Sequence, residues 1–270
     1  SLFSFFTLIS RILGYLRDIL IAIFLGASIF ADAFFVAFRL PNTFRRLFAE
    51  GTFNAAFIPS YTSAKIEDKK KGKNFADDVL SLLSLTLLFL VTLAEIFTPY
   101  LIYVIAPGFL EDQGKFNLAV ELTRITFPFL LFVSLSSFFA GILNSNNKFA
   151  AAAAAPIILN VVLIISLILS FIFELNYTTQ LSYGVTIAGI IQLLFLIYIT
   201  KKYYEPSLNF NFKINNKVKF FFKKLLPSIL SSGVTQINIL VGTIIASFQS
   251  GAVSYLYYAD RVYQINLAIA

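Results

Sequence analysis

The chain has 270 residues, of which 58% are hydrophobic and 13% charged. The charged share is about half that of an average soluble domain, which excludes an ordinary soluble enzyme and a disordered chain. Without cysteine or histidine, the chain offers no disulfide, no thiolate metal site and no histidine base, and we expect no cofactor. The net charge of +7 on so apolar a chain indicates a membrane, and not nucleic acid, as the partner.

Eight apolar segments predict an all-α, polytopic membrane protein with about eight transmembrane helices. Segment 156–172 is typical of them, because it is apolar on every face and lacks the period-two alternation of barrel strands. Prolines such as Pro41, Pro99 and Pro128 are tolerated in transmembrane helices. The segments cover roughly residues 2–27, 31–64, 77–106, 118–145, 150–173, 181–200, 225–248 and 252–270.

Lysines in the loops predict the orientation, because cytoplasmic loops are rich in Lys and Arg. If successive loops alternate sides, one side receives thirteen lysines and the other only Lys115 and Arg124. The thirteen are Lys65, Lys69, Lys70, Lys71, Lys73, Lys148, Lys201, Lys202, Lys213, Lys217, Lys219, Lys223 and Lys224. We therefore expect the N-terminus in the cytoplasm.

Segment 203–224 is aromatic, basic and too polar to span a membrane. We expect it to lie on the cytoplasmic membrane surface, with phenylalanines in the interface and lysines toward anionic lipid. It divides the chain into a first six-helix bundle at 1–202, an amphipathic connector, and the start of a second bundle at 225–270.

A weak internal repeat supports two related bundles. Residues 18–27 resemble 238–247, and residues 33–40 resemble 255–262, so that Arg39 and Arg261 occupy equivalent places. We expect the chain to be part of a longer protein.

Charged residues inside the predicted spans carry most of the functional information. Each arginine near the bilayer centre costs about 2.5–3.5 kcal/mol, so such residues face a bundle interior or a cavity. The first two spans hold Arg11, Arg17, Asp18, Asp32, Arg39, Arg45, Arg46 and Glu50. Pairing of Arg17 with Asp18 and of Asp32 with Arg39 would leave excess positive charge. Guanidinium groups bind phosphate oxygens bidentately, so this excess indicates a phosphate- or pyrophosphate-bearing substrate.

Structural roles compete with binding for several of these residues. Arg11 could reach the cytoplasmic interface, and Arg39 or Arg46 could serve only ion pairing. Asp32, Arg39 and Arg46 are spaced by sevens and share one helix face. The carboxylate pairs Asp77-Asp78 and Glu111-Asp112 lie beside predicted loops, and we expect them to cap helices and not to act in catalysis.

Several motifs occur in a specific order: SRILGYLRD at 10–18, ADAFFVAFR at 31–39, FRRLFAEG at 44–51, APGF at 106–109 and YYADR at 257–261. Together they resemble the MurJ (MviN) family of lipid II flippases, over the whole chain. The resemblance implies the fold of the multidrug/oligosaccharidyl-lipid/polysaccharide (MOP) exporter superfamily, in which two helical bundles face a central cavity.

The resemblance also implies a function. By position, substrate binding would fall to Arg11, Arg17, Arg45 and Arg261, and Asp32 matches an acidic residue that is also important in the family. From their charge and their place in the first two spans, we expect ion pairing or gating by Asp18, Asp32, Arg39, Arg46 and Glu50. A transporter, not an enzyme, would move lipid II from the cytoplasmic to the periplasmic leaflet of the bacterial inner membrane by alternating access. Lipid II is the undecaprenyl-pyrophosphate-linked disaccharide-pentapeptide used for peptidoglycan synthesis. Besides this lipid and the membrane, cell-wall synthesis proteins of unknown identity would be partners.

The sequence leaves three alternatives open. Another polysaccharide-lipid flippase of the superfamily also handles pyrophosphate, and charge does not exclude it. A drug exporter for cations would favour buried acids over arginines. A membrane scaffold that transports nothing would not need five arginines in its first two spans.

Overall fold

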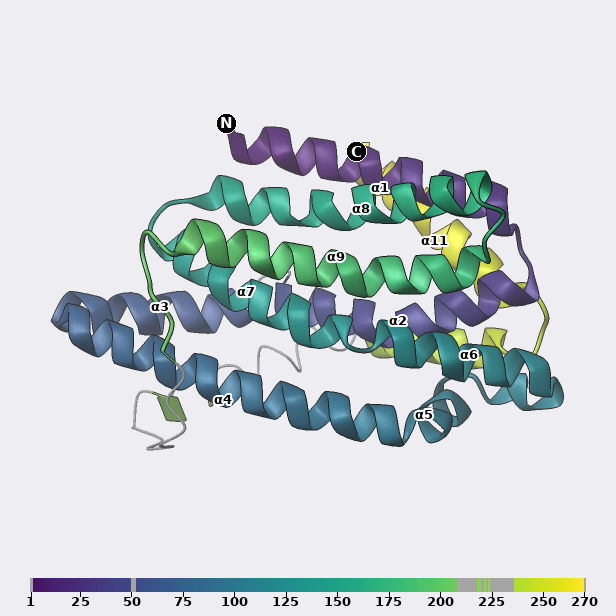
Figure 1. Cartoon of the computed structure of the whole chain (residues 1–270), viewed down its shortest axis with the longest axis horizontal. Helices are drawn as coiled ribbons and strands as arrows, with labels where there is room; N and C mark the ends of the chain where they lie inside the picture. The colour runs from purple at the N-terminus through teal and green to yellow at the C-terminus, as the bar shows by residue number, and fades with distance from the viewer. Residues whose placement is uncertain are drawn as a thin grey trace.

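The computed structural model describes residues 2–49, 52–207, 218, 219, 221, 223 and 236–269. Within these ranges the chain forms α-helices and one short 3-10 helix, and no strand. The long helices run side by side with short turns at both ends of the molecule (Figure 1). The all-α prediction is therefore confirmed.

The first two predicted spans correspond to three helices, α1 (Leu2–Leu25), α2 (Ile29–Ala49) and α3 (Thr52–Glu67). α2 continues through Pro41, so the helix face shared by residues spaced by sevens persists. Glu50 lies outside the described residues, between α2 and α3.

The third and fourth predicted spans are each built from two helices. α4 (Lys69–Ile96) is followed by α5 (Thr98–Ile105), and η1 (Pro107–Glu111) leads to α6 (Gln113–Thr126) and α7 (Phe129–Ser145). The breaks fall at prolines, because proline removes a backbone donor and is best tolerated in the first turn of a helix. Pro99 lies in the first turn of α5, and Pro128 directly precedes α7.

The remaining helices are α8 (Phe149–Ile172), α9 (Tyr177–Thr200), a short apolar helix at Gln236–Ala246, and α11 (Ala252–Ile269). By length and composition, four helical stretches in the described part of the chain can cross a membrane: Lys69–Ile96, Gln113–Ser145, Phe149–Ile172 and Tyr177–Thr200. The full count of eight stays a prediction.

Two expectations about helix ends were wrong. The lysine-rich stretch 65–76 is not a loop: α3 reaches Glu67, and α4 begins at Lys69 with Asp68 as its N-cap, accepting from the Lys70 N–H. Asp77 therefore lies inside α4 and does not cap it. Instead its carboxylate accepts from the Tyr204 hydroxyl at 2.6 Å and the Ser207 N–H at 3.0 Å. The capping role predicted for Asp112 is confirmed, since it accepts from the Lys115 N–H at the start of α6.

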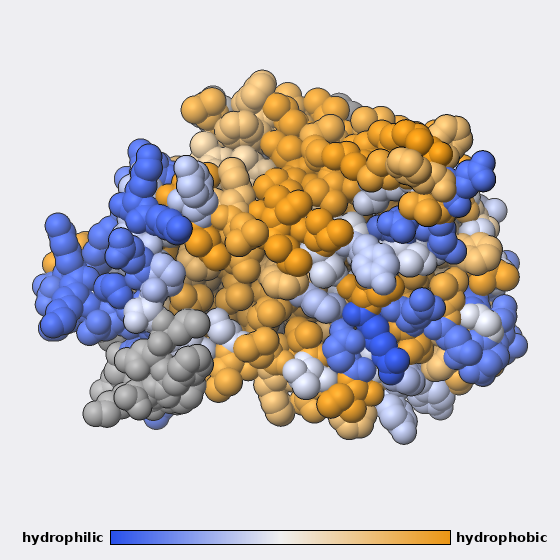
Figure 2. Space-filling model, in the orientation of Figure 1, coloured by the Kyte–Doolittle hydropathy of each residue, from blue (hydrophilic) through white to orange (hydrophobic). Residues whose placement is uncertain are grey.

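α1 has an apolar exposed face and a polar buried face. Its exposed side chains include Leu8, Ile12 and Ile23, whereas Arg17 and Asp18 are buried. This distribution is typical of a helix that faces lipid on one side and a bundle interior on the other. Apolar residues likewise dominate the middle of the face shown in Figure 2, and hydrophilic residues gather toward the ends of the helices.

Two apolar cores hold the helices together. One joins α1, α2, α6, α8, α9 and α11, and the other joins α3, α4 and α7. Phe221 is fully buried in the second core, where its ring packs edge-on against Phe53, Phe57 and Phe75. The expectation that the phenylalanines of segment 203–224 lie in the membrane interface is wrong for Phe221, because this aromatic pocket removes its ring from the surface. Most of that segment lies outside the described residues.

Candidate functional site

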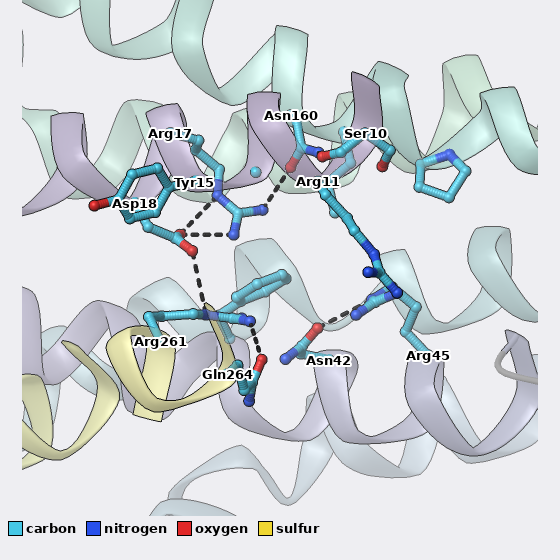
Figure 3. A pocket seen from close by; sticks show the side chains of 14 residues that line it. Ser10, Arg11, Tyr15, Arg17, Asp18, Asn42, Arg45, Asn160, Arg261 and Gln264 are labelled. Carbon is cyan, nitrogen blue, oxygen red and sulfur yellow. Dashed lines mark hydrogen bonds and ion pairs between the residues drawn. The ribbon is translucent and has the colours of Figure 1, made fainter. Parts of the chain in front are cut away.

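Four arginines from three helices line a single cavity of about 380 Å³ (Figure 3). Arg11 and Arg17 come from α1, Arg45 from α2 and Arg261 from α11. We call this space the arginine cavity. Its other lining residues are Ser10, Gly14, Tyr15, Asp18, Phe38, Asn42, Pro156, Leu159, Asn160 and Gln264. The structure thus brings together the four arginines that the sequence singled out, and their role in binding stays a prediction.

Asp18 joins two of these arginines. Its Oδ1 accepts from Arg17 Nη2 at 2.6 Å and Nε at 2.9 Å, while its Oδ2 lies 3.2 Å from Arg261 Nε. The Tyr257 hydroxyl donates to Asp18 Oδ1 at 3.1 Å and accepts from Arg261 Nη2 at 3.2 Å. The expected Arg17–Asp18 pair is present, and it extends across to α11.

Arg17 is oriented from a third helix as well. Its Nη1 donates to Asn160 Oδ1 on α8 at 2.8 Å, and Asn160 Nδ2 donates to the Ser10 carbonyl at 2.9 Å. A guanidinium held at both ends in this way keeps one orientation, because its planar fork fixes the direction of each donor.

Arg11 and Arg45 line the other end of the cavity, as Figure 3 shows. Arg45 Nε donates to Asn42 Oδ1 at 3.0 Å, one helical turn back on α2. Arg11 is exposed.

The cavity carries a positive charge. Four arginines and one carboxylate among its lining residues leave a formal excess of three positive charges. Within the described residues, no group of three or more His, Cys, Asp or Glu side chains could hold a metal ion. The arrangement is therefore suited to binding an anion, and most directly a phosphate group, through guanidinium donors.

Asp32 does not lie on this cavity. The predicted ion pair between Asp32 and Arg39 is absent. Asp32 is fully buried and forms an ion pair with Lys115 of α6 at 2.7 Å. Its oxygens also accept from the Gly251 N–H at 2.7 Å, the Ser254 N–H at 2.9 Å and the Ser254 hydroxyl at 2.6 Å. The free N–H groups at the N-terminal end of α11 therefore hold the carboxylate in its position.

Arg39 and Arg46 do not line the arginine cavity. Arg39 is buried, and its Nε and Nη2 have no hydrogen-bond partner among the described residues. Arg46 is half-buried. Their predicted role in gating or ion pairing stays untested, and Glu50 is outside the described residues.

Sequence reasoning missed several polar residues of these networks. Lys115 was interpreted as a loop residue that marks orientation, yet it is buried and its Nζ lies 4.1 Å from the centre of the Phe109 ring. Asn160 could have been found, since it is the one amide in a helix that is otherwise apolar except for two serines. Ser254 and Tyr257 offer no comparable signal, because serine and tyrosine are common in transmembrane helices.

Comparison with known proteins decides the family. The family model described as "Lipid II flippase MurJ" matches residues 21–270. The chain belongs to the MurJ family. The "Probable lipid II flippase MurJ" of Rickettsia prowazekii is 44% identical over 269 residues, which cover 98% of this chain and 52% of that protein. The relative of the same name from Aquifex aeolicus is 36% identical over 272 residues, covering 99% and 53%. This MurJ-family chain thus spans about half the length of the curated relatives it matches.

Solved structures agree with the MurJ assignment. "Lipid II flippase MurJ, inward closed conformation" superposes with a TM-score of 0.84 at 33% identity, over 98% of this chain and 54% of that one. A MOP superfamily transporter from Pyrococcus furiosus gives a TM-score of 0.70 at 17% identity, over 97% and 59%, which shows a shared fold only. The present chain is a multi-pass membrane protein, because it has apolar helices long enough to cross a membrane and belongs to the MurJ family.

Proposed function

We propose that the protein moves lipid II from the cytoplasmic to the periplasmic leaflet of the bacterial inner membrane by alternating access, as a flippase and not as an enzyme. The arginine cavity carries this proposal, because Arg11, Arg17, Arg45 and Arg261 face one space with a single carboxylate among them. The pyrophosphate of lipid II needs such a concentration of fixed cations. Chemistry on the lipid would need reactive groups, whereas transport needs only binding and release.

Contacts between the helices preceding residue 207 and α11 support alternating access. α11 is linked to α1 through Asp18 and Arg261, and to α2 through Asp32 and Ser254. Both links are polar and can be exchanged for water or substrate. Beside them, Val253 and Tyr257 of α11 pack in the apolar core that also holds α1 and α2. On this basis residues 1–202 would form one bundle, 203–224 a connector and 225–270 the beginning of a second bundle that moves against the first.

The lysines support an N-terminus in the cytoplasm. The α3–α4 turn, the α7–α8 turn and the C-terminal end of α9 lie at the same end of the molecule (Figure 1). They carry Lys65, Lys69, Lys148, Lys201 and Lys202, and positive charge of this density favours the cytoplasmic side.

Binding measurements test the proposal. Protein in nanodiscs of neutral lipid is titrated with lipid II and with undecaprenol, which has a tail of the same kind but no pyrophosphate. Lipid II should bind, and undecaprenol should not compete. Arg17→Ala or Arg261→Ala should weaken lipid II binding about tenfold or more, because each removes charge-assisted hydrogen bonds of about 1.5–3 kcal/mol.

Arg124→Ala is the matched control, since Arg124 lies on exposed α6 surface away from the cavity. Equal affinity for both lipids would contradict the proposal and favour a scaffold without transport function. A preference for other pyrophosphate-linked saccharides over lipid II would favour a different flippase of the superfamily.

A further inference from the structure

A second space adjoins the arginine cavity. It measures about 420 Å³ and shares Ser10, Arg11, Arg45, Pro156 and Leu159 with that cavity. From there it continues between α3, α7, α8 and α9, toward the end of the molecule where the lysine-bearing turns lie. Because the shared residues form a common boundary, a ligand held by Arg11 or Arg45 can extend into this second space, which we call the amide pocket.

Small residues on two helices create the room. On α7, Ser136, Ser137, Ala140 and Asn144 recur at helical spacing and face the pocket. On α8, Ala152, Ala153 and Ala155 line the opposite side. Large side chains at these positions would fill the space, so the volume is a property of the sequence.

Three polar atoms in the walls lack partners. Within the described residues, Ser136 Oγ, Asn54 Oδ1 and Asn144 Oδ1 are buried and form no hydrogen bond. The Ser136 side chain belongs to a residue that is only 4% exposed. A buried polar atom without a partner costs about 1–3 kcal/mol. The three atoms are shielded from water as the side chains stand, so the cost is recovered when the side chains turn toward a ligand that supplies the missing partner.

Close packing holds Asn54 against this wall. A Cβ on Gly141 would lie 2.7 Å from Asn54 Oδ1 and 2.9 Å from Phe57 Cδ1. Glycine at position 141 therefore allows α3 to approach α7 closely enough to bring the Asn54 amide beside Asn144 and Ser136. The amide is fixed by backbone packing even though its oxygen has no donor.

The charges around the pocket determine what chemistry fits. Arg11 and Arg45 at its boundary disfavour a cation. The Asn54 and Asn144 amides each offer one acceptor and two donors, and the Ser136 hydroxyl can donate or accept. Neutral groups that both donate and accept hydrogen bonds, such as hydroxyls and amides, match these side chains.

We propose that the amide pocket binds the hydroxyl- and amide-bearing saccharide part of the lipid whose pyrophosphate lies in the arginine cavity. This proposal rests on the proposed function and deepens it, because it gives the protein a means to distinguish a loaded carrier lipid from a bare one. Phe3, Phe149 and Leu196 also line the pocket, so the lipid tail is the competing occupant. A hydrocarbon chain would leave Ser136, Asn54 and Asn144 without partners, which favours the saccharide.

The test compares two ligands that share the tail and the pyrophosphate. Wild-type protein and the variants Ser136→Ala and Asn144→Ala, in neutral nanodiscs, are titrated with lipid II and with undecaprenyl pyrophosphate. Each variant should weaken lipid II binding about fivefold, which corresponds to one hydrogen bond of about 1 kcal/mol, and leave undecaprenyl pyrophosphate affinity within twofold of wild type. Ala153→Leu, which fills the pocket without removing a polar group, should have the same selective effect.

Ser134→Ala is the matched control. Ser134 is also buried on α7, and its Oγ is also unpartnered among the described residues, but it does not line the pocket. It should change neither affinity. The proposed pocket function is overturned if the three pocket variants Ser136→Ala, Asn144→Ala and Ala153→Leu leave the affinities for both lipids unchanged or weaken both affinities equally. It is also overturned if their affinities equal those of Ser134→Ala. The proposed flippase function fails separately, if Arg17→Ala leaves the affinity for both pyrophosphate lipids unchanged.

Discussion

Arg261 of α11 lies 3.2 Å from Asp18 of α1, across an interface between segments 243 residues apart in the chain. The same carboxylate also binds Arg17. One acid is therefore shared by two of the four cavity arginines. An incoming phosphate can replace Asp18 as the partner of either one, so the cavity can be occupied without a net loss of ion pairs.

The geometry of Arg17 predicts that its fork, and not only its charge, is required. Arg17 binds Asp18 and Asn160 through different nitrogens, and a lysine ammonium cannot span both in the same plane. Arg17→Lys should therefore lose lipid II affinity nearly as severely as Arg17→Ala. Arg11→Lys should retain most of it, because Arg11 is exposed and supplies mainly charge. Titration in nanodiscs measures the lipid II affinity of both lysine variants. If Arg17→Lys and Arg11→Lys retain the same share of the wild-type affinity, the planar fork of Arg17 is not required.

Asp18→Asn should destabilise the protein. Removal of one partner from a buried ion pair leaves the other charge uncompensated and costs about 3–5 kcal/mol. Here two arginines lose their carboxylate partner, while Arg17 keeps Asn160 and Arg261 keeps Gln264. We expect a lower midpoint in thermal unfolding followed by circular dichroism in detergent. Glu121→Gln on exposed α6 surface is the control, and an unfolding midpoint equal to that of wild type would argue against a structural role of Asp18.

Asp32 should hold the N-terminal end of α11 against α2. In Asp32→Asn the carboxylate that accepts from Gly251 and Ser254 and pairs with Lys115 is lost. We expect this end of the interface to open more often. The chain contains no cysteine, so a single Val253→Cys, at a fully buried position, reports opening through its rate of modification by a water-soluble thiol reagent.

The cysteine of the single variant Val253→Cys should be labelled slowly. In the double variant that also carries Asp32→Asn, the same cysteine should be labelled several-fold faster. A cysteine introduced at Ile66, which is 83% exposed, should label at one rate in both backgrounds. Unchanged labelling at position 253 would mean that Asp32 does not restrain α11.

Tyr204 should contribute to stability in a pH-dependent way. Burial, together with the hydrogen bond to Asp77, raises the pKa of the Tyr204 hydroxyl above its ordinary value of 10.0. In the unfolded chain this hydroxyl ionises near pH 10, whereas in the folded protein it stays protonated. Stability from Tyr204 is therefore fully present below about pH 10 and is lost as the pH rises above it.

Tyr204→Phe should lower the free energy of unfolding at neutral pH by about 1–3 kcal/mol, because Asp77 loses a buried donor. It should also reduce the loss of stability above pH 10. Tyr198→Phe, at a position 75% exposed, is the control. Parallel pH profiles for wild type and Tyr204→Phe would contradict the assignment.

The helical architecture and the cavity arginines could be predicted because both depend on strong, local signals. Uninterrupted apolar segments can only be helices in a membrane, and an arginine at membrane depth must face a cavity or a partner. Six arginines met that second condition, and the resemblance to the MurJ family separated Arg11, Arg17, Arg45 and Arg261 from Arg39 and Arg46. The convergence of the first four followed once the helices packed.

Partner choice could not be predicted, because it depends on contacts far apart in the sequence. Spacing along α2 suggested Arg39 as the partner of Asp32, but the α6 and α11 backbones bring Lys115 and Ser254 closer. Asp77 was assigned to a helix end for a similar reason. Nothing in the sequence indicates that α4 begins at Lys69 and that Tyr204 returns to it from the end of α9.

The two faces of α1 have a consequence for how this helix can vary. Successive residues of an α-helix are rotated by about 100°, so one residue inserted or deleted between Ile12 and Arg17 would rotate Leu8 and Ile12 relative to Arg17 and Asp18. Apolar substitutions on the lipid side should be nearly interchangeable, while one change in length should be as damaging as the loss of an arginine. For α1, the spacing between its residues is therefore constrained more tightly than the identity of most of them.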